Sequence, residues 1–336
     1  MPTFGNRGTL SRAGALACLS GLLALSAQAA TQWEFSSIMP PGNFAAEHSL
    51  RFAEAVKEAT GGEVTINVHL GGALGLKGPE TLVAVQDGIV HVADMQMNQQ
   101  IGEDKFFGIE SVPFLATGFV ELRVLQGFTR PHFDEIAKQH NQKILYIYPF
   151  PPQNLHANTA TDTSVDQFAG IKVRTIDKNA TDFFTALGAV PLQMPWAEVI
   201  PALSTGVIDA VSTSATSGVD GKFWEFMTHV NELHWQMNSF MVSVNLDAWN
   251  AISPEHQDII EEIAERMEPE IWIASFNDDA ASIATLEENG MTITQPSPEL
   301  KQQLNEVGES MWQAAIEEIG PRAEEVIGRY RQMVGK

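Results

Sequence analysis

The sequence predicts an α/β protein of two lobes with long helices near its C-terminus, and three observations support this. Stretches with the period of a strand alternate with stretches with the period of a helix along almost the whole chain. The alternation begins again near residue 172, as a second unit would. The chain of 336 residues is also longer than a single hydrophobic core usually extends.

Four strands and three helices are expected in the first half of the chain. Asn43 is a preferred helix N-cap residue, and Phe52 and Val56 lie on one helix face before Gly61 ends that helix. The glycine-rich loop 71–78 lacks the Lys-Ser or Lys-Thr pair of a phosphate-binding loop, so we interpret it as a turn. The expected strands are 32–38, 64–70, 89–95 and 143–148, and the expected helices are 43–60, 80–87 and 119–140.

The second half repeats the alternation and then becomes helical. Ser253 and Pro254 form a helix start, and an apolar seam follows them. Pro269 lies inside this seam and predicts a kink or a break there. The expected strands are 172–176, 190–192 and 291–294, and the expected helices are 179–187, 197–204 and two long helices that begin at Ser253 and Ser297.

These elements predict a domain division. The first lobe is expected at 31–150 and the second at 151–246, with 247–336 as a helical region that bridges them and partly returns to the first lobe. We expect hinges near 150–153 and near Leu246, and a cleft between the lobes. Clefts at domain interfaces are favoured ligand sites.

The N-terminal segment predicts export. Arg7 and Arg12 precede or open an apolar stretch, 13–25, and Ala27-Gln28-Ala29 resembles a signal-peptidase site. A transmembrane anchor is the alternative, but this stretch is shorter than the ~20 residues that a bilayer requires. We therefore expect a signal peptide at 1–30, cleaved after Ala29 or Ala30, and a periplasmic protein. N-terminal sequencing of the periplasmic fraction should find Ala30 or Thr31 first, and an intact Met1 in the cytoplasm would contradict this.

The chain contains little of the chemistry that enzymes need. Its one cysteine, Cys18, lies in the predicted leader, so the mature protein has no disulfide and no thiolate. The nine histidines form no HExxH or HxH pair, which predicts no metal site. No nucleophile elbow or dinucleotide motif occurs either. We expect no cofactor and no enzyme, with a periplasmic hydrolase kept as an alternative because distant carboxylate pairs leave no motif.

The charge is strongly negative. Removing 1–30 removes two arginines and no acid, which takes the formal net charge from −22 to −24. This argues against nucleic acid and membrane surfaces as partners and favours a soluble monomer. Because salt screens the self-repulsion of such a chain, we expect NaCl up to about 1 M to raise the melting temperature. A melting temperature that stays constant or falls as NaCl is added would contradict this.

Four ordered motifs lie within about forty residues. They are Gly170-Ile-Lys-Val-Arg174, Leu187-Gly-Ala-Val-Pro191, Met194-Pro-Trp-Ala-Glu-Val-Ile200, and Ala202-Leu203 followed by Gly206-Val-Ile-Asp-Ala210. This order resembles the DctP-type solute-binding proteins of TRAP (tripartite ATP-independent) transporters, over essentially the whole mature chain. The resemblance implies the two-lobed periplasmic binding protein fold with a ligand cleft. It also implies two kinds of partner, a small organic solute and the small and large membrane subunits of the transporter.

The resemblance also implies site residues. In the family the arginine that matches Arg174 binds the solute's carboxylate, which its planar fork fits bidentately. The aromatic residue that matches Trp196 packs on the solute. Where relatives often have an asparagine, this sequence has Thr213, so a hydroxyl replaces an amide. Between 149 and 171 the only basic candidate is His156, which argues against a dianionic or sialic-acid-like solute.

Weaker candidates complete the predicted site, each of them placed near the cleft in relatives or beside the stronger ones: Asn43, Phe44, Gln96, Phe150, Ser217 and Trp224. The leading interpretation is capture of a small monocarboxylate, aromatic or hydroxylated, for delivery to membrane subunits. The alternative within binding is a small amine or zwitterion such as an amino alcohol, held by aromatics and an acid, with Arg174 serving the structure.

Overall fold

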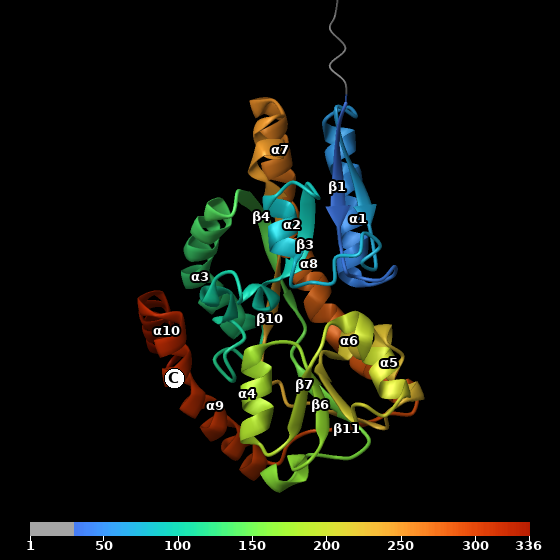
Figure 1. Cartoon of the computed structure of the whole chain (residues 1–336), viewed down its shortest axis with the longest axis vertical. Coiled ribbons are helices and arrows are strands. Elements are labelled where there is room, and N and C mark those ends of the chain that lie inside the picture. Colours follow the sequence, from blue (N-terminus) through green and yellow to red (C-terminus); the bar gives the residue numbers. More distant parts are fainter. Residues whose placement is uncertain (1–29) are drawn as a thin grey trace, which may run out of the picture.

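The computed structural model describes residues 30–336, which form two lobes, each built on its own β-sheet. In Figure 1 the first sheet occupies the upper half of the molecule and the second sheet the lower half. The predicted α/β class is confirmed. The predicted signal peptide lies outside the described residues except for Ala30. No helix in the described range is both long and apolar enough to cross a membrane.

The first sheet has five strands in the order β2-β1-β3-β10-β4. β1 runs parallel to β2 and β3, whereas β10 runs antiparallel to β3 and β4. The strands are β1 Thr31–Ser36, β2 Val64–His69, β3 Val92–Gln96, β4 Gln142–Phe150 and β10 Asn238–Asn245. The helices of this lobe are α1 Phe44–Ala59, α2 Thr81–Gln86, α3 Phe119–Gln139 and α7 Leu246–Asn250.

The second sheet has six strands in the order β11-β9-β5-β8-β6-β7. β6 runs parallel to its neighbours β7 and β8, so the carboxyl ends of these strands point the same way. The strands are β5 Asn154–Ala157, β6 Lys172–Thr175, β7 Val190–Gln193, β8 Ala210–Thr213, β9 His229–Asn231 and β11 Thr292–Thr294. The short helices are α4 Lys178–Ala186, α5 Val199–Ser204 and α6 Ala215–Asp220.

The position of β10 corrects the predicted division of the chain. The segment 151–246 does not form the second lobe as a whole, because β10 pairs with β3 and β4 in the first sheet. The chain crosses between the sheets at 151–153, as expected, but it returns at 232–237 rather than near Leu246. β10 was not among the expected strands, and because it is buried along its whole length and suits the centre of either sheet, its pattern does not reveal its partner strands either.

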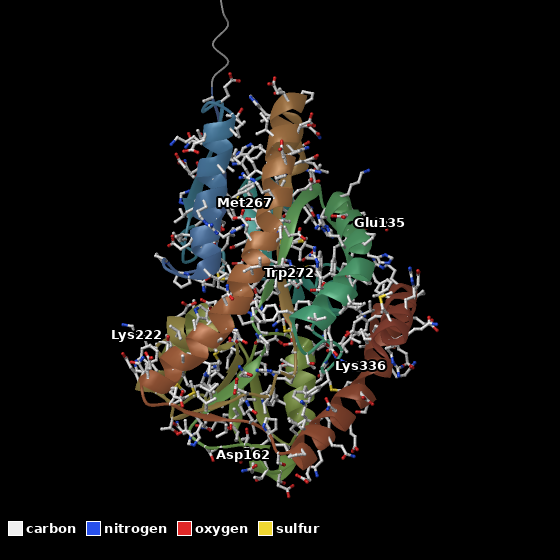
Figure 2. All side chains as sticks on the ribbon, turned by 180° about the vertical axis from the view of Figure 1, so that it is seen from behind. Glu135, Asp162, Lys222, Met267, Trp272 and Lys336 are labelled. Atoms are coloured by element: carbon white, nitrogen blue, oxygen red, sulfur yellow. The ribbon has the colours of Figure 1, made fainter. Side chains whose placement is uncertain are left out.

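Three long C-terminal helices connect the lobes. α8, Pro254–Glu288, packs against α1 and β4 of the first lobe and against α6 of the second. Pro269 does not break this helix, but Figure 2 shows that α8 changes direction between Met267 and Trp272. α9, Pro298–Ile319, packs against α4, and α10, Pro321–Val334, packs against α3.

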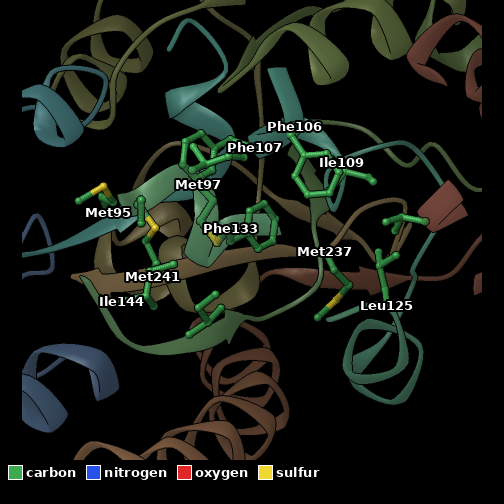
Figure 3. Packing of buried hydrophobic residues seen from close by; sticks show 14 of the residues in the cluster. Met95, Met97, Phe106, Phe107, Ile109, Leu125, Phe133, Ile144, Met237 and Met241 are labelled. Atoms are coloured by element: carbon green, nitrogen blue, oxygen red, sulfur yellow. The ribbon is translucent and has the colours of Figure 1, made fainter. Parts of the chain in front are cut away.

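Apolar side chains cover both faces of the first sheet. Successive residues of β10 point to opposite faces, so Met241 belongs to one core and Phe240 and Val242 belong to the other. Figure 3 shows the Met241 core, in which Phe107 and Phe133 stack with ring centroids 5.8 Å apart. A sheet packed on both faces is a rigid support for residues at its strand ends.

Candidate functional site

A cavity lies between the two lobes, where strand ends of both sheets meet. The space between its side chains is about 520 Å³, part of it open to solvent. Its walls come from both lobes and from the first connection between them: Ile38, Met39, Pro40, Gln96, Gln99, Phe150, Gln153, Arg174, Ile176, Trp196, Thr213, Ser217, Asp220 and Phe240. Sites beyond the carboxyl ends of strands are typical of open α/β sheets.

Arg174 is the one basic residue in this wall among the described residues. β6 carries it between β7 and β8, and only 1% of its surface is exposed. Its Nε donates a hydrogen bond to the Met194 carbonyl oxygen at 3.0 Å. Its Nη2 has no partner within residues 30–336, and no carboxylate in that range forms an ion pair with it.

The electrostatics of Arg174 are those of a buried cation. Burial lowers the pKa of its guanidinium to about 10, and the charge of Asp177 opposes that shift. The group therefore remains protonated at neutral pH. Its Cζ also lies 6.0 Å from the ring centroid of Trp196. A buried guanidinium that lacks a protein carboxylate can take one from a solute.

The structure brings six of the ten predicted site residues to this cavity. Besides Arg174 these are two aromatic residues, two residues with hydroxyl groups and one with a side-chain amide, namely Trp196 and Phe150, Thr213 and Ser217, and Gln96. Thr213 ends β8 and Gln96 ends β3, so the two sheets present polar groups toward one another.

His156 does not line the cavity, which corrects its prediction as a basic contact. It is fully buried in β5, where its Nε2 lies 3.1 Å from the Ser214 carbonyl oxygen and its ring packs edge-on against Phe223 at 5.1 Å. Burial lowers the pKa of His156 to about 4, so it is neutral at pH 7. Neither the strand that carries His156 nor the face to which its side chain points was predicted from the sequence.

Asn43, Phe44 and Trp224 lie behind the cavity wall rather than in it. Asn43 caps α1 through its Oδ1, and its Nδ2 donates to Oδ2 of Asp220 at 2.8 Å. Phe44 packs against Phe150 with ring centroids 5.5 Å apart. Trp224 packs against a core cluster of the second lobe. They can position residues that line the cavity.

Asp220 is the most consequential wall residue that the sequence analysis missed. It ends α6, three positions after Ser217, a spacing that brings two residues to one helix face. That spacing was the available signal. Burial raises the pKa of Asp220 to about 6; the hydrogen bond from Asn43 acts against this shift, and the charge of Asp278 adds to it.

The other missed wall residues are apolar or amides, namely Ile38, Met39, Pro40, Gln99, Gln153, Ile176 and Phe240. Such residues carry no motif, and only the fold brings them together. Among residues 30–336 no group of three or more His, Cys, Asp or Glu side chains is arranged to hold a metal ion.

Comparison with known proteins agrees with this geometry. The model of bacterial extracellular solute-binding proteins, family 7 (DctP), matches residues 35–318. The chain belongs to this family. Family 7 proteins bind solutes for transport, so the hydrolase alternative is not supported.

Curated relatives are distant and match in part. The chain is 23% identical over 191 residues to the sialic acid-binding periplasmic protein SiaP of Vibrio cholerae, covering 56% of this chain and 59% of that one. It is 22% identical over 202 residues to the ectoine-binding periplasmic protein TeaA of Halomonas elongata, covering 59% of each. The matches thus span about three-fifths of these relatives.

Solved structures match over more of the chain. DctP7 of Bordetella pertussis, an extracytoplasmic solute receptor binding pyroglutamic acid, is 28% identical with a TM-score of 0.86, covering 90% of this chain and all of the other. A marine metagenome TRAP solute-binding protein specific for pyroglutamate is 27% identical with a TM-score of 0.85, covering 90% and 99%. These similarities agree with the two-lobed periplasmic binding protein fold.

Proposed function

We propose that this protein is the periplasmic, monomeric receptor of a TRAP transporter, which captures a small organic monocarboxylate and delivers it to the membrane subunits. The proposal rests mainly on the environment of Arg174. Its guanidinium is a buried cation in the cavity wall, and it has no carboxylate partner in the described chain. A single such cation balances one carboxylate. Two carboxylates on one solute would leave the second one desolvated without a counter-charge.

The rest of the wall narrows the kind of monocarboxylate. Phe150, Trp196 and Phe240 provide flat apolar surface, which suits a compact ring. Asp220 provides a carboxylate that can accept a hydrogen bond from an N–H group of the solute. Pyroglutamate has a carboxylate, a small ring and a lactam N–H, and it is the solute of the two similar structures. It is our first candidate.

A zwitterion is the second candidate, because Arg174 and Asp220 put opposite charges in one cavity. An α-amino acid would place its carboxylate on Arg174 and its ammonium on Asp220. An amine with no carboxylate, such as an amino alcohol, would leave the Arg174 charge unpaired.

Mass spectrometry of the solute released by unfolding the purified protein tests this proposal, together with a thermal-shift screen of carboxylates, amino acids and amines. A carboxylate that raises the melting temperature supports it. A screen in which amines without a carboxylate stabilise the protein and carboxylates do not would overturn it.

The role of Asp220 predicts a pH dependence. A lactam N–H donates to the charged carboxylate, so pyroglutamate affinity should fall as the pH drops through about 6, where Asp220 takes up a proton. The fall should level off at roughly tenfold in all, because a hydrogen bond to a charged acceptor is about 1–1.5 kcal/mol stronger than one to a neutral acceptor. The matched lactone, whose ring oxygen only accepts hydrogen bonds, should bind more tightly as the pH falls. Calorimetry between pH 8 and pH 5 measures both, and parallel pH profiles would contradict the role of Asp220.

A further inference from the structure

An outer groove between the lobes lies beside the solute cavity. This groove has about 540 Å³ of space, part of it open, and its walls include Ile101 of the first lobe and Gln193 of the second. Two side chains line both the cavity and the groove, Gln99 from the first lobe and Ile176 from the second. They therefore form the boundary between the two spaces.

The Gln99 side chain is held in place by the glycine-rich loop. Gly78 has a φ of +126°, and a Cβ at this position would lie 2.0 Å from Oε1 of Gln99 and 2.9 Å from its Cδ. Only glycine leaves room for the carboxamide of Gln99 in this arrangement. The loop is tied to the same 3₁₀ turn, Met97–Gln100, because Nε2 of Gln100 donates to the Gly78 carbonyl oxygen at 2.9 Å.

The contacts of the carboxamide indicate that bulk, rather than a hydrogen bond within the protein, is what Gln99 contributes. Its Oε1 is enclosed and has no hydrogen-bond partner in residues 30–336. The head group rests against Gly78, so the side chain is kept at the boundary of the cavity. The loop 71–78, which was expected to be only a turn, therefore positions the side chain of Gln99.

We infer that Gln99 is a specificity-determining gate, which limits the length of the solute and slows its escape into the outer groove. The inference rests on the proposed function, because it takes a carboxylate on Arg174 as the inner end of the solute. A solute that reaches from Arg174 toward Ile176 meets Gln99 and must end there. Truncating Gln99 would join the cavity to the groove, which gives longer solutes room and gives every solute a wider exit.

The test compares Gln99→Ala with Gln99→Met and with Gln193→Ala. Methionine keeps the length of the side chain without its amide, and Gln193 is an exposed glutamine that lines the outer groove but not the cavity. Dissociation is followed by stopped-flow tryptophan fluorescence, with pyroglutamate or the tightest-binding acid from the screen. Affinity is measured by calorimetry for linear monocarboxylates from propionate to octanoate.

Gln99→Ala is expected to speed dissociation roughly tenfold and to bind the longest acids about tenfold more tightly than the parent. Gln99→Met and Gln193→Ala should behave as the parent does. If the parent binds a carboxylate and Gln99→Ala changes neither the dissociation rate nor the affinity for long acids, Gln99 is not a gate, whereas the proposed function stands. A Gln99→Met variant that matches Gln99→Ala would also overturn a gate based on bulk. If no carboxylate binds the parent, both proposals fall.

Discussion

Replacing Arg174 with alanine is expected to weaken solute binding by roughly 10²- to 10³·⁵-fold. The reason is that the solute's carboxylate would enter a desolvated cavity without its counter-charge, and breaking such a buried pair costs about 3–5 kcal/mol. Arg174→Lys should restore part of the affinity, since an ammonium matches one oxygen of the carboxylate but not the planar fork. Calorimetry with the best acid from the screen measures all three proteins.

The solute-free stability of the same variants separates a binding role from a structural one. In the described chain Arg174 makes a single hydrogen bond, to Met194, and its charge is desolvated. Its loss should therefore leave the melting temperature of the free protein unchanged or raised. Arg266→Ala, at an exposed position on α8, is the matched control for charge. A variant that melts earlier without solute yet binds as the parent does would make Arg174 structural.

Asp94 carries the second large expected effect, on stability rather than on binding. This residue of β3 is 1% exposed and accepts hydrogen bonds from Ser37 Oγ at 2.8 Å and Tyr148 Oη at 3.3 Å. Burial raises the pKa of Asp94 to about 7 from an ordinary 3.8, although both hydrogen bonds act against that shift. The folded protein therefore holds a proton between these pH values that the unfolded chain has released.

The sign of the stability change follows from this proton. Where the folded state binds more protons, the free energy of unfolding falls as the pH rises. Asp94 should thus lower that free energy between pH 4 and pH 7, by about 4 kcal/mol over the whole window. Asp94→Asn should remove this contribution to the pH dependence of the free energy of unfolding. Urea unfolding of both proteins at several pH values measures it, and parallel profiles would contradict the assignment.

The sequence was most informative where a residue's neighbours in the chain determine its environment. Asn43 caps α1 and Ser253 caps α8, as predicted, because capping is a local property. The strand that carries Arg174 was expected at 172–176 and is β6, Lys172–Thr175. The resemblance to the family predicted Arg174 and Trp196 as site residues, and both line the cavity.

The sequence was least informative where the answer depends on contacts between distant segments. His156 and Arg174 both lie on strands of the second sheet, yet one points under α6 and the other into the cavity. β10 was not among the expected strands, and its partners β3 and β4 are distant in the chain. Asp220 acquires its environment from Asn43, 177 positions away in the chain. Pro269, in contrast, was expected to kink or break a helix, and α8 does change direction there while it continues through the contacts with both lobes.

The proposed function depends on one claim about the site, namely that Arg174 binds the carboxylate of the solute. The most direct test is a calorimetric titration of the parent protein with pyroglutamate and with its primary amide, which has the same ring and nearly the same shape but no charge. We predict that the acid binds and that the amide binds at least about 10²-fold more weakly, because the guanidinium then loses its counter-charge. Equal affinities for the acid and the amide would contradict the claim.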